Sequence, residues 1–183
     1  MQSWKNLVHC PYVPQAFSET GLVCGQDYDV LHRQESSIFV RLTTPLPAWK
    51  ATWYLPDDQM GQSFIMGTNR RTVTKLEIPS GSQVHLSEDY GTYDDIDSSK
   101  LRASQAKILE HQLHPDHVLA GQDVELQSTR SLYSCKPWES HCSDVYTVGA
   151  LFEPNGFSLK PEVCAQGVHF FATEERARQY EWQ

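Results

Sequence analysis

The chain has 183 residues, of which 39% are hydrophobic and 21% are charged, and its formal net charge is −8 at pH 7. This length and this apolar share exclude a disordered chain and predict one domain, residues 1–183, built around a single core. The negative charge argues against nucleic acid as a partner, because it provides no general attraction to phosphate backbones.

The sequence predicts neither a membrane span nor a targeting segment. No stretch approaches the roughly 20 apolar residues of a membrane helix. Residues 1–6 (MQSWKN) lead into neither an apolar signal core nor an Arg-rich transit helix. We therefore expect a soluble, intracellular protein of the cytoplasm with no membrane partner. The five cysteines form no CxxC unit, and we expect them to be reduced, with one disulfide or a metal site as the alternatives.

Residues 1–60 are predicted to form an irregular N-terminal extension that carries one pair of strands. Residues 37–43 (SIFVRLT) are β-branched and aromatic, as is typical of a strand. Residues 48–55 (AWKATWYL) alternate, which places the two tryptophans on one face and Lys50 on the other. The proline-containing link between the two segments is expected to be a short turn.

Residues 64–183 are predicted to hold the main part of the fold, interrupted by an insertion at residues 111–143. A short helical turn is expected at residues 98–104. The end of the chain should form a helix with Thr173 as its N-cap, because two glutamates follow it. Period-2 patterns and turn residues predict strands at residues 72–79, 83–86, 106–110, 144–149 and 168–171.

Strand signals dominate the chain, and strands do not alternate with helices. This pattern argues against a doubly wound parallel sheet. We therefore predict an α+β fold, a single domain in which a twisted, mainly antiparallel sheet carries a C-terminal helix. The helix is expected to pack on one face through Ala177 and Tyr180, with Trp182 as a further candidate.

Several blocks of the chain resemble an uncharacterised domain found in large DNA viruses, in phages and in pentapeptide-repeat-associated proteins. The blocks lie within residues 64–180, and they are residues 75–79 (KLEIP), 101–109 (LRASQAKIL), 146–149 (YTVG) and 164–173 (CAQGVHFFAT). The resemblance implies a module attached to other proteins, and it brings no known activity with it.

The densest group of metal-binding side chains lies in the predicted insertion. Imidazole and thiolate side chains are the ligands that zinc prefers, and His114, His117, Cys135 and Cys142 are the candidates here. Their spacing matches no standard zinc knuckle, so a polar surface loop is the alternative interpretation.

Residues 167–171 (GVHFF), followed by a helix, resemble one motif of the ADP-ribosyltransferases. This resemblance implies an enzyme that handles a nucleotide or NAD, with His169 and Tyr180 beside the cofactor. The alternative interpretation is a core strand followed by a helix that covers it.

His169 is the single best candidate for a ligand contact. Its neighbours Val168 and Phe170 are expected to face the core, so the histidine must point to the other side of the strand. There it could meet Trp53 or Glu77, and an imidazole can donate or accept a hydrogen bond near neutral pH. A partly exposed histidine without a ligand is the alternative interpretation.

No complete set of catalytic residues can be assembled from the sequence, and no phosphate-binding glycine motif is present. We therefore expect a binding or interaction protein with a protein or small-molecule ligand, related to viruses or phages through the first resemblance. The alternative is the nucleotide- or NAD-handling enzyme. The sequence does not predict an oligomeric state.

Overall fold

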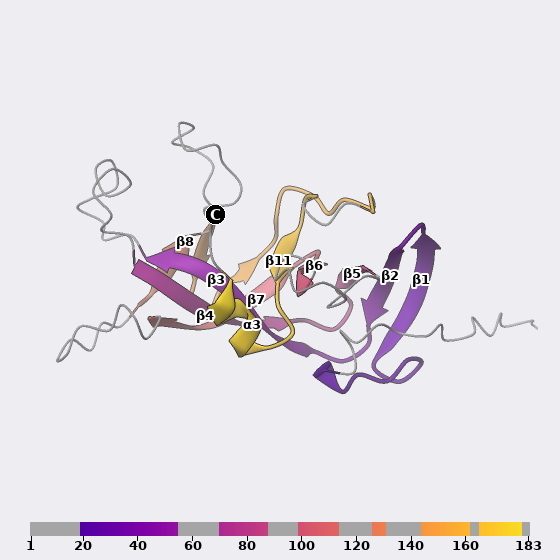
Figure 1. Ribbon diagram of the computed structural model, residues 1–183, viewed down its shortest axis with the longest axis horizontal. Coiled ribbons are helices and arrows are strands. Elements are labelled where there is room, and N and C mark those ends of the chain that lie inside the picture. Colours follow the sequence, from indigo (N-terminus) through magenta and orange to yellow (C-terminus); the bar gives the residue numbers. More distant parts are fainter. Residues whose placement is uncertain are drawn as a thin grey trace, which may run out of the picture.

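The computed structural model describes residues 19–54, 70–87, 99–113, 126–130, 144–161 and 165–180. These residues form two antiparallel sheets and a short C-terminal helix (Figure 1). The expected dominance of antiparallel strands with a helix at the end is confirmed. In the described ranges, no helix has the length and apolar character needed to cross a membrane.

The five-stranded sheet is built entirely from antiparallel pairs. One face of each strand carries apolar residues that enter the core, as in Val84 and Leu86. The strands in spatial order are β1 (Tyr28–Gln34), β2 (Ser37–Leu42), β5 (Gln83–Ser87), β6 (Leu101–Ala103) and β11 (Val168–Phe170).

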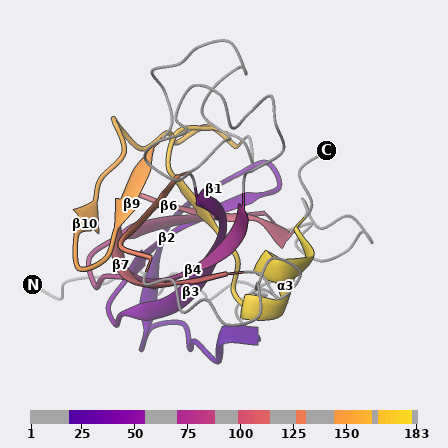
Figure 2. The ribbon, with the colours of Figure 1, turned by 90° about the vertical axis from the view of Figure 1, so that its left-hand side faces the viewer.

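The six-stranded sheet curls back on itself. Its two edge strands, β9 and β10, follow each other in the chain, and β9 pairs with β8 whereas β10 pairs with β7. The amide of Gly149, in the turn between them, donates to the carbonyl of Ile108 at 2.9 Å, so the chain itself joins the two edges. In Figure 2, β9 and β10 rise on one side of β7, β4 and β3. The strands in spatial order are β10 (Leu151–Phe152), β7 (Ala106–Leu113), β4 (Arg70–Ile78), β3 (Leu46–Tyr54), β8 (Ser128–Arg130) and β9 (Val145–Thr147).

Both sheets contribute to one hydrophobic cluster, which includes Val40 and Phe170 of the five-stranded sheet and Leu76 and Ile108 of the six-stranded sheet. The sheets are also joined directly beyond the end of β11. There the backbones of Trp49 and Phe171 exchange two hydrogen bonds, at 3.0 and 2.7 Å.

Helix α3 (Glu174–Gln179) lies on the outer face of β3 and β4. Ala177 and Tyr180 pack there against Ala51, Val73 and Phe171, which confirms these two predicted contact residues. The further candidate, Trp182, lies outside the described residues. The predicted N-cap is also confirmed, because the hydroxyl of Thr173 accepts from the amide of Arg176 at 3.4 Å.

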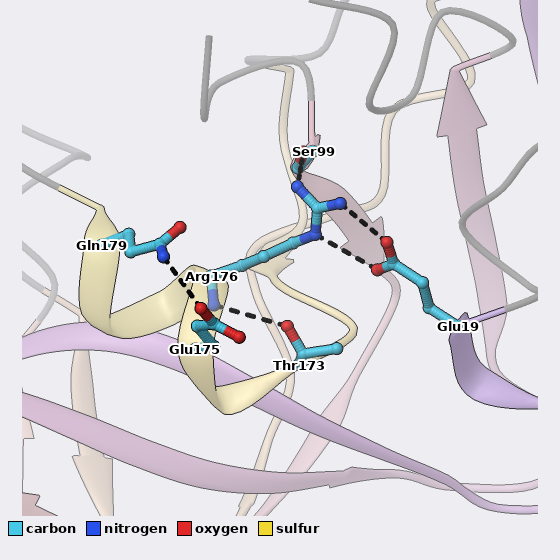
Figure 3. A network of polar contacts seen from close by, with 6 residues as sticks. All are labelled: Glu19, Ser99, Thr173, Glu175, Arg176 and Gln179. Atoms are coloured by element: carbon cyan, nitrogen blue, oxygen red, sulfur yellow. Dashed lines mark hydrogen bonds and ion pairs between the residues drawn. The ribbon is translucent and has the colours of Figure 1, made fainter. Parts of the chain in front are cut away.

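Arg176 connects the helix to two distant segments of the chain through hydrogen bonds and an ion pair (Figure 3). Its guanidinium donates to the hydroxyl of Ser99 at 2.6 Å and to the two carboxylate oxygens of Glu19 at 3.1 and 2.7 Å. A planar guanidinium matches a carboxylate in this two-point geometry, so the contact fixes the orientation of the side chain.

Three predictions of the sequence analysis need correction. There are two sheets rather than one, and the segments predicted as a strand pair do not pair, because β2 joins β1 and β5 whereas β3 joins β4 and β8. The strands before residue 60 therefore belong to the same sheets as the later ones. Residues 101–103 are strand β6 rather than part of a helical turn, because pairing on both sides overrides their helix propensity. Of the predicted insertion, the structure describes residues 111–113, which belong to β7, and residues 126–130, which contain β8, so the insertion itself stays a prediction.

The expected reduced state is wrong for Cys24, which is disulfide-bonded. The other four cysteines lie outside the described residues. Disulfides persist in oxidising environments, so the cytoplasmic location stays a prediction.

Candidate functional site

The interior of the six-stranded sheet changes from apolar to polar along its strands. On β3, the inward-facing residues are Leu46 and Ala48 and then Lys50 and Thr52. The change from apolar to polar residues occurs at the same level on β4, which pairs with β3, and on β7, which pairs with β4. The resulting polar cluster is buried, with no member more than 8% exposed, and consists of Lys50, Thr52, Thr72, Thr74, His111 and Thr129.

The hydroxyls of the polar cluster form a connected chain of hydrogen bonds that leads to His111. Thr52 Oγ1 lies 2.7 Å from both Thr72 Oγ1 and Thr74 Oγ1, and Thr74 Oγ1 lies 2.8 Å from His111 Nδ1. Thr129 Oγ1 lies 3.2 Å from both Thr74 Oγ1 and His111 Nδ1.

The carbonyl of Tyr146 fixes the tautomer of His111. This carbonyl can only accept and lies 3.0 Å from His111 Nε2, so the ring proton must be on Nε2. His111 Nδ1 is then an acceptor, and the hydroxyl of Thr74 donates to it. Burial lowers the pKa of His111, with the hydrogen bond to Tyr146 acting in the opposite direction, so the ring is neutral at pH 7.

Lys50 is the one amine of the polar cluster, and it is 5% exposed. Its Nζ donates to the carbonyl of His169 at 2.9 Å and lies 5.4 Å from the ring centre of Tyr146. Burial lowers its pKa from the usual 10.5 to about 8; the charge of Asp144 opposes this shift and that of Lys100 adds to it. At pH 7 the amine is still mainly protonated, so the interior of the sheet contains a positive charge.

Asp144 immediately precedes β9 and is half-buried. Burial raises the pKa of its carboxyl, whereas the charge of Lys50 and a hydrogen bond from the side chain of Tyr146 lower it. Tyr54 and Leu113, at the ends of β3 and β7, are also half-buried. These three half-buried residues, which we call the rim, therefore border the buried polar cluster at this end of the interior.

The structure places His169 on the opposite face from Val168 and Phe170, as predicted. Its neighbour in register is Arg102, which is in turn paired with His85. Trp53 and Glu77 belong to the six-stranded sheet, whereas His169 belongs to the five-stranded sheet. The three residues predicted to meet therefore do not lie on one sheet. The backbone carbonyl of His169 accepts a hydrogen bond from Lys50 of the polar cluster.

Arg102 holds a covering segment, residues 157–161 and 165–167, on the outer face of the five-stranded sheet. Its guanidinium donates to the carbonyls of Ser158, Lys160 and Gln166. Gly167 has a φ of 151°, and a Cβ there would overlap the Arg102 side chain. The buried guanidinium of Arg102 therefore attaches the covering segment to the five-stranded sheet.

His85 and Ser37 also help to attach the covering segment to the sheet. His85 Nε2 lies 2.9 Å from Ser37 Oγ, and this hydroxyl donates to the carbonyl of Pro161 at 3.1 Å. Burial and then the charge of Arg102 lower the pKa of His85 to about 4, with the Pro161 carbonyl opposing the shift. The single hydroxyl proton of Ser37 is donated to the Pro161 carbonyl and not to His85. The two residues are therefore not arranged as a nucleophile and its base.

Tyr180 and Trp53 lie near the C-terminal end of α3. The hydroxyl of Tyr180 accepts from Lys100 Nζ at 2.6 Å, and its carbonyl accepts from Arg71 at 3.0 Å. Arg71 stands opposite Trp53 in the β3–β4 register, so Trp53 lies beside the residue that contacts the end of α3. Glu77 lies towards the other end of β4, opposite Pro47.

The predicted zinc ligands His114, His117, Cys135 and Cys142 lie outside the described residues. Within the described ranges, no group of three or more His, Cys, Asp or Glu side chains could hold a metal ion.

The polar cluster was not predicted from the sequence, although two signals for it were present. Lys50 and Thr52 alternate with the tryptophans on β3, and Thr72 and Thr74 alternate with Val73 on β4. A polar alternating face is normally the solvent face of a sheet. Only the curling of the six-stranded sheet turns this face inward.

No protein-family model, curated protein or solved structure matches this chain. The resemblances described above therefore stay predictions.

Proposed function

We propose that this chain is a small-molecule-binding protein, and that its ligand is a small organic acid bound at the polar end of the six-stranded sheet. The ligand's carboxylate would bind beside Lys50, and its other polar groups would bind the rim around the polar cluster. Closed or strongly curled sheets commonly bind ligands in this way, within the ring of strands.

The observation that supports the proposal is the buried amine of Lys50. An ammonium has three N–H donors. Among the described residues, Lys50 makes one hydrogen bond, to the carbonyl of His169. A buried positive charge with spare donors attracts an anion more strongly than a surface charge does, because little water screens it.

A second argument concerns folding stability. Burial lowers the pKa of Lys50 to about 8, which means that the folded state disfavours the charge. An apolar side chain at this position would fill the interior at a smaller cost. A residue that folding alone does not explain is a candidate for function.

A thermal-shift screen with small 2-hydroxy and 2-oxo acids tests the proposal, with the corresponding neutral amides as controls. At 100 times the dissociation constant, binding should stabilise the protein by about 2.7 kcal/mol. For a chain of this length the melting temperature should then rise by roughly 5 to 10 °C.

Two variants make the screen specific. Lys50→Met removes the charge at similar size and should abolish the shift. Lys75→Met removes an exposed charge from the opposite face of the same sheet, one residue along β4 from Thr74, and should preserve the shift. The proposal fails if no acid shifts the melting temperature, or if Lys50→Met responds like the wild type.

A further inference from the structure

Two buried lysines influence each other electrostatically, and they differ in their partners. Lys100 Nζ donates to the hydroxyl of Tyr180 at 2.6 Å and lies 4.3 Å from the centre of that ring. Lys50 Nζ has the carbonyl of His169 as its hydrogen-bond acceptor among the described residues. A neutral amine needs fewer acceptors than an ammonium and keeps a lone pair, so one described acceptor is compatible with the neutral form of Lys50.

Removal from water and a nearby cation are the two conditions that activate a lysine as a nucleophile. Lys50 has both, because it is 5% exposed and the charge of Lys100 acts on it. With a pKa of about 8, roughly one Lys50 side chain in ten is neutral at pH 7, compared with about one in 2,500 for an ordinary lysine.

The surroundings of Lys50 also contain a carboxyl group that can exchange a proton with the amine. Asp144 is close enough for its charge to act on Lys50, and burial raises the pKa of its carboxyl. The side chain of Tyr146 hydrogen-bonds to Asp144 and also lies below the Lys50 amine. An acid next to an amine can protonate the oxygen that leaves when the amine condenses with a carbonyl group.

We propose that Lys50 forms an imine with the aldehyde or ketone group of a small organic acid bound at the polar cluster. The protonated amine would first pass a proton to the Asp144 carboxylate. The neutral amine would then add to the carbonyl carbon, and one amine proton would move to the carbonyl oxygen to give a carbinolamine. Asp144 would protonate the hydroxyl as it leaves as water, and the C=N bond would form as a protonated imine. The balance is one protonated amine and one carbonyl compound giving one protonated imine and one water.

This inference rests on the proposed binding function and narrows the ligand to a 2-oxo acid or a related aldehyde acid. The carboxylate would place such a ligand beside the positive end of the site, and its carbonyl carbon would then lie within reach of the amine. A 2-hydroxy acid would bind in the same place without reacting.

Reductive trapping tests the inference. The intact protein is incubated at pH 7 with pyruvate or glyoxylate, then treated with sodium borohydride, which converts an imine to a stable secondary amine. Peptide mass spectrometry then locates the modified lysines. We expect Lys50 to be labelled at least about tenfold more than the exposed Lys75, because a larger fraction of it is neutral. Lactate, which has no carbonyl group to condense, should compete with the labelling.

The outcomes separate this inference from the proposed function. Lys50→Arg keeps the charge, so it should retain the thermal shift with both acids and lose the labelled peptide. A thermal shift in the wild type without labelling at Lys50 overturns the imine and leaves the binding site in place. Labelling that is equal at Lys50 and Lys75, or that lactate does not reduce, also overturns the imine. If Lys50→Arg does not fold, the lactate competition on the wild type still decides the question.

Discussion

The two ends of the interior of the six-stranded sheet are made by the same strands and the same faces, but their residues differ. At one end lie Leu46, Leu76 and Ile108, and at the other Lys50, Thr74 and His111. Burial of apolar surface explains the first set, since each fully buried aliphatic side chain contributes roughly 1.5 to 3 kcal/mol. Each residue of the second set replaces hydrogen bonds to water by internal hydrogen bonds, so it contributes much less to the free energy of folding. The polar end is therefore where the sequence departs from what folding requires.

The largest effect is expected at the apolar end. Leu76 is fully buried in the cluster shared by both sheets, so Leu76→Ala should lower the free energy of unfolding by about 2 to 5 kcal/mol. Urea denaturation measures the change. Leu151→Ala is the matched control, because Leu151 is 52% exposed and its loss should change stability by less than about 0.5 kcal/mol. Equal losses in the two variants would contradict the assignment of the core.

The next effect should have the opposite sign. The pKa of Lys50 falls from 10.5 to about 8, which corresponds to roughly 3 kcal/mol of stability lost at pH 7. Lys50→Met removes this cost and loses one hydrogen bond, so we expect a gain of about 1 to 3 kcal/mol.

The pH dependence gives a second measure of Lys50. Between about pH 8 and 10.5 the unfolded chain binds more protons at this lysine than the folded chain, so the stability of the wild type rises with pH. The advantage of Lys50→Met should therefore shrink over this range. A variant that is less stable than the wild type at pH 7 would show that Lys50 serves the fold.

A smaller loss is expected from the hydroxyl chain. Thr74→Val keeps the shape of the side chain and removes the hydroxyl that contacts Thr52, Thr129 and His111 Nδ1. Because an acceptor is then left buried, the free energy of unfolding should fall by about 1 to 2 kcal/mol. Ser128→Ala, at an exposed position on β8, should change little. If Thr74→Val is as stable as the wild type, the hydroxyl chain contributes nothing to the fold.

Local signals in the sequence predicted several of the strands and the end of the chain, but not β6, β8 or β10. β-Branched runs and alternation predicted β2 and β4, and a threonine followed by two glutamates predicted the start of α3. Pairing partners were not predictable in this way. Whether β2 meets β3 or β5 depends on contacts between residues far apart in the chain, and local pattern does not encode them.

The candidate site was less predictable than the fold. His169 was identified by its position between two core residues, and its orientation is as expected. Lys50 and Thr74 lie on a face that would be exposed in a flat sheet, so their burial follows from the curvature and from the turn that joins β9 to β10. Curvature arises from the whole sheet, and no single segment predicts it.

The smallest effect expected at the polar end is a change in acid sensitivity. The pKa of His111 is lowered by burial, so the unfolded chain binds more protons at this residue as the pH falls below about 6.5. The stability contributed by the neutral ring is therefore present above that pH and is lost on acidification, with a slope of at most about 1.4 kcal/mol per pH unit for one proton. His85, whose pKa is lowered to about 4, adds a slope of the same sign from the five-stranded sheet. His111→Gln should remove one of the two slopes, and His85→Gln the other, in urea unfolding measured between about pH 7 and pH 4.5. An unchanged slope in His111→Gln would mean that His111 is protonated in the folded protein, in which case Nδ1 could not accept from Thr74 and the direction of the hydroxyl chain would be reversed.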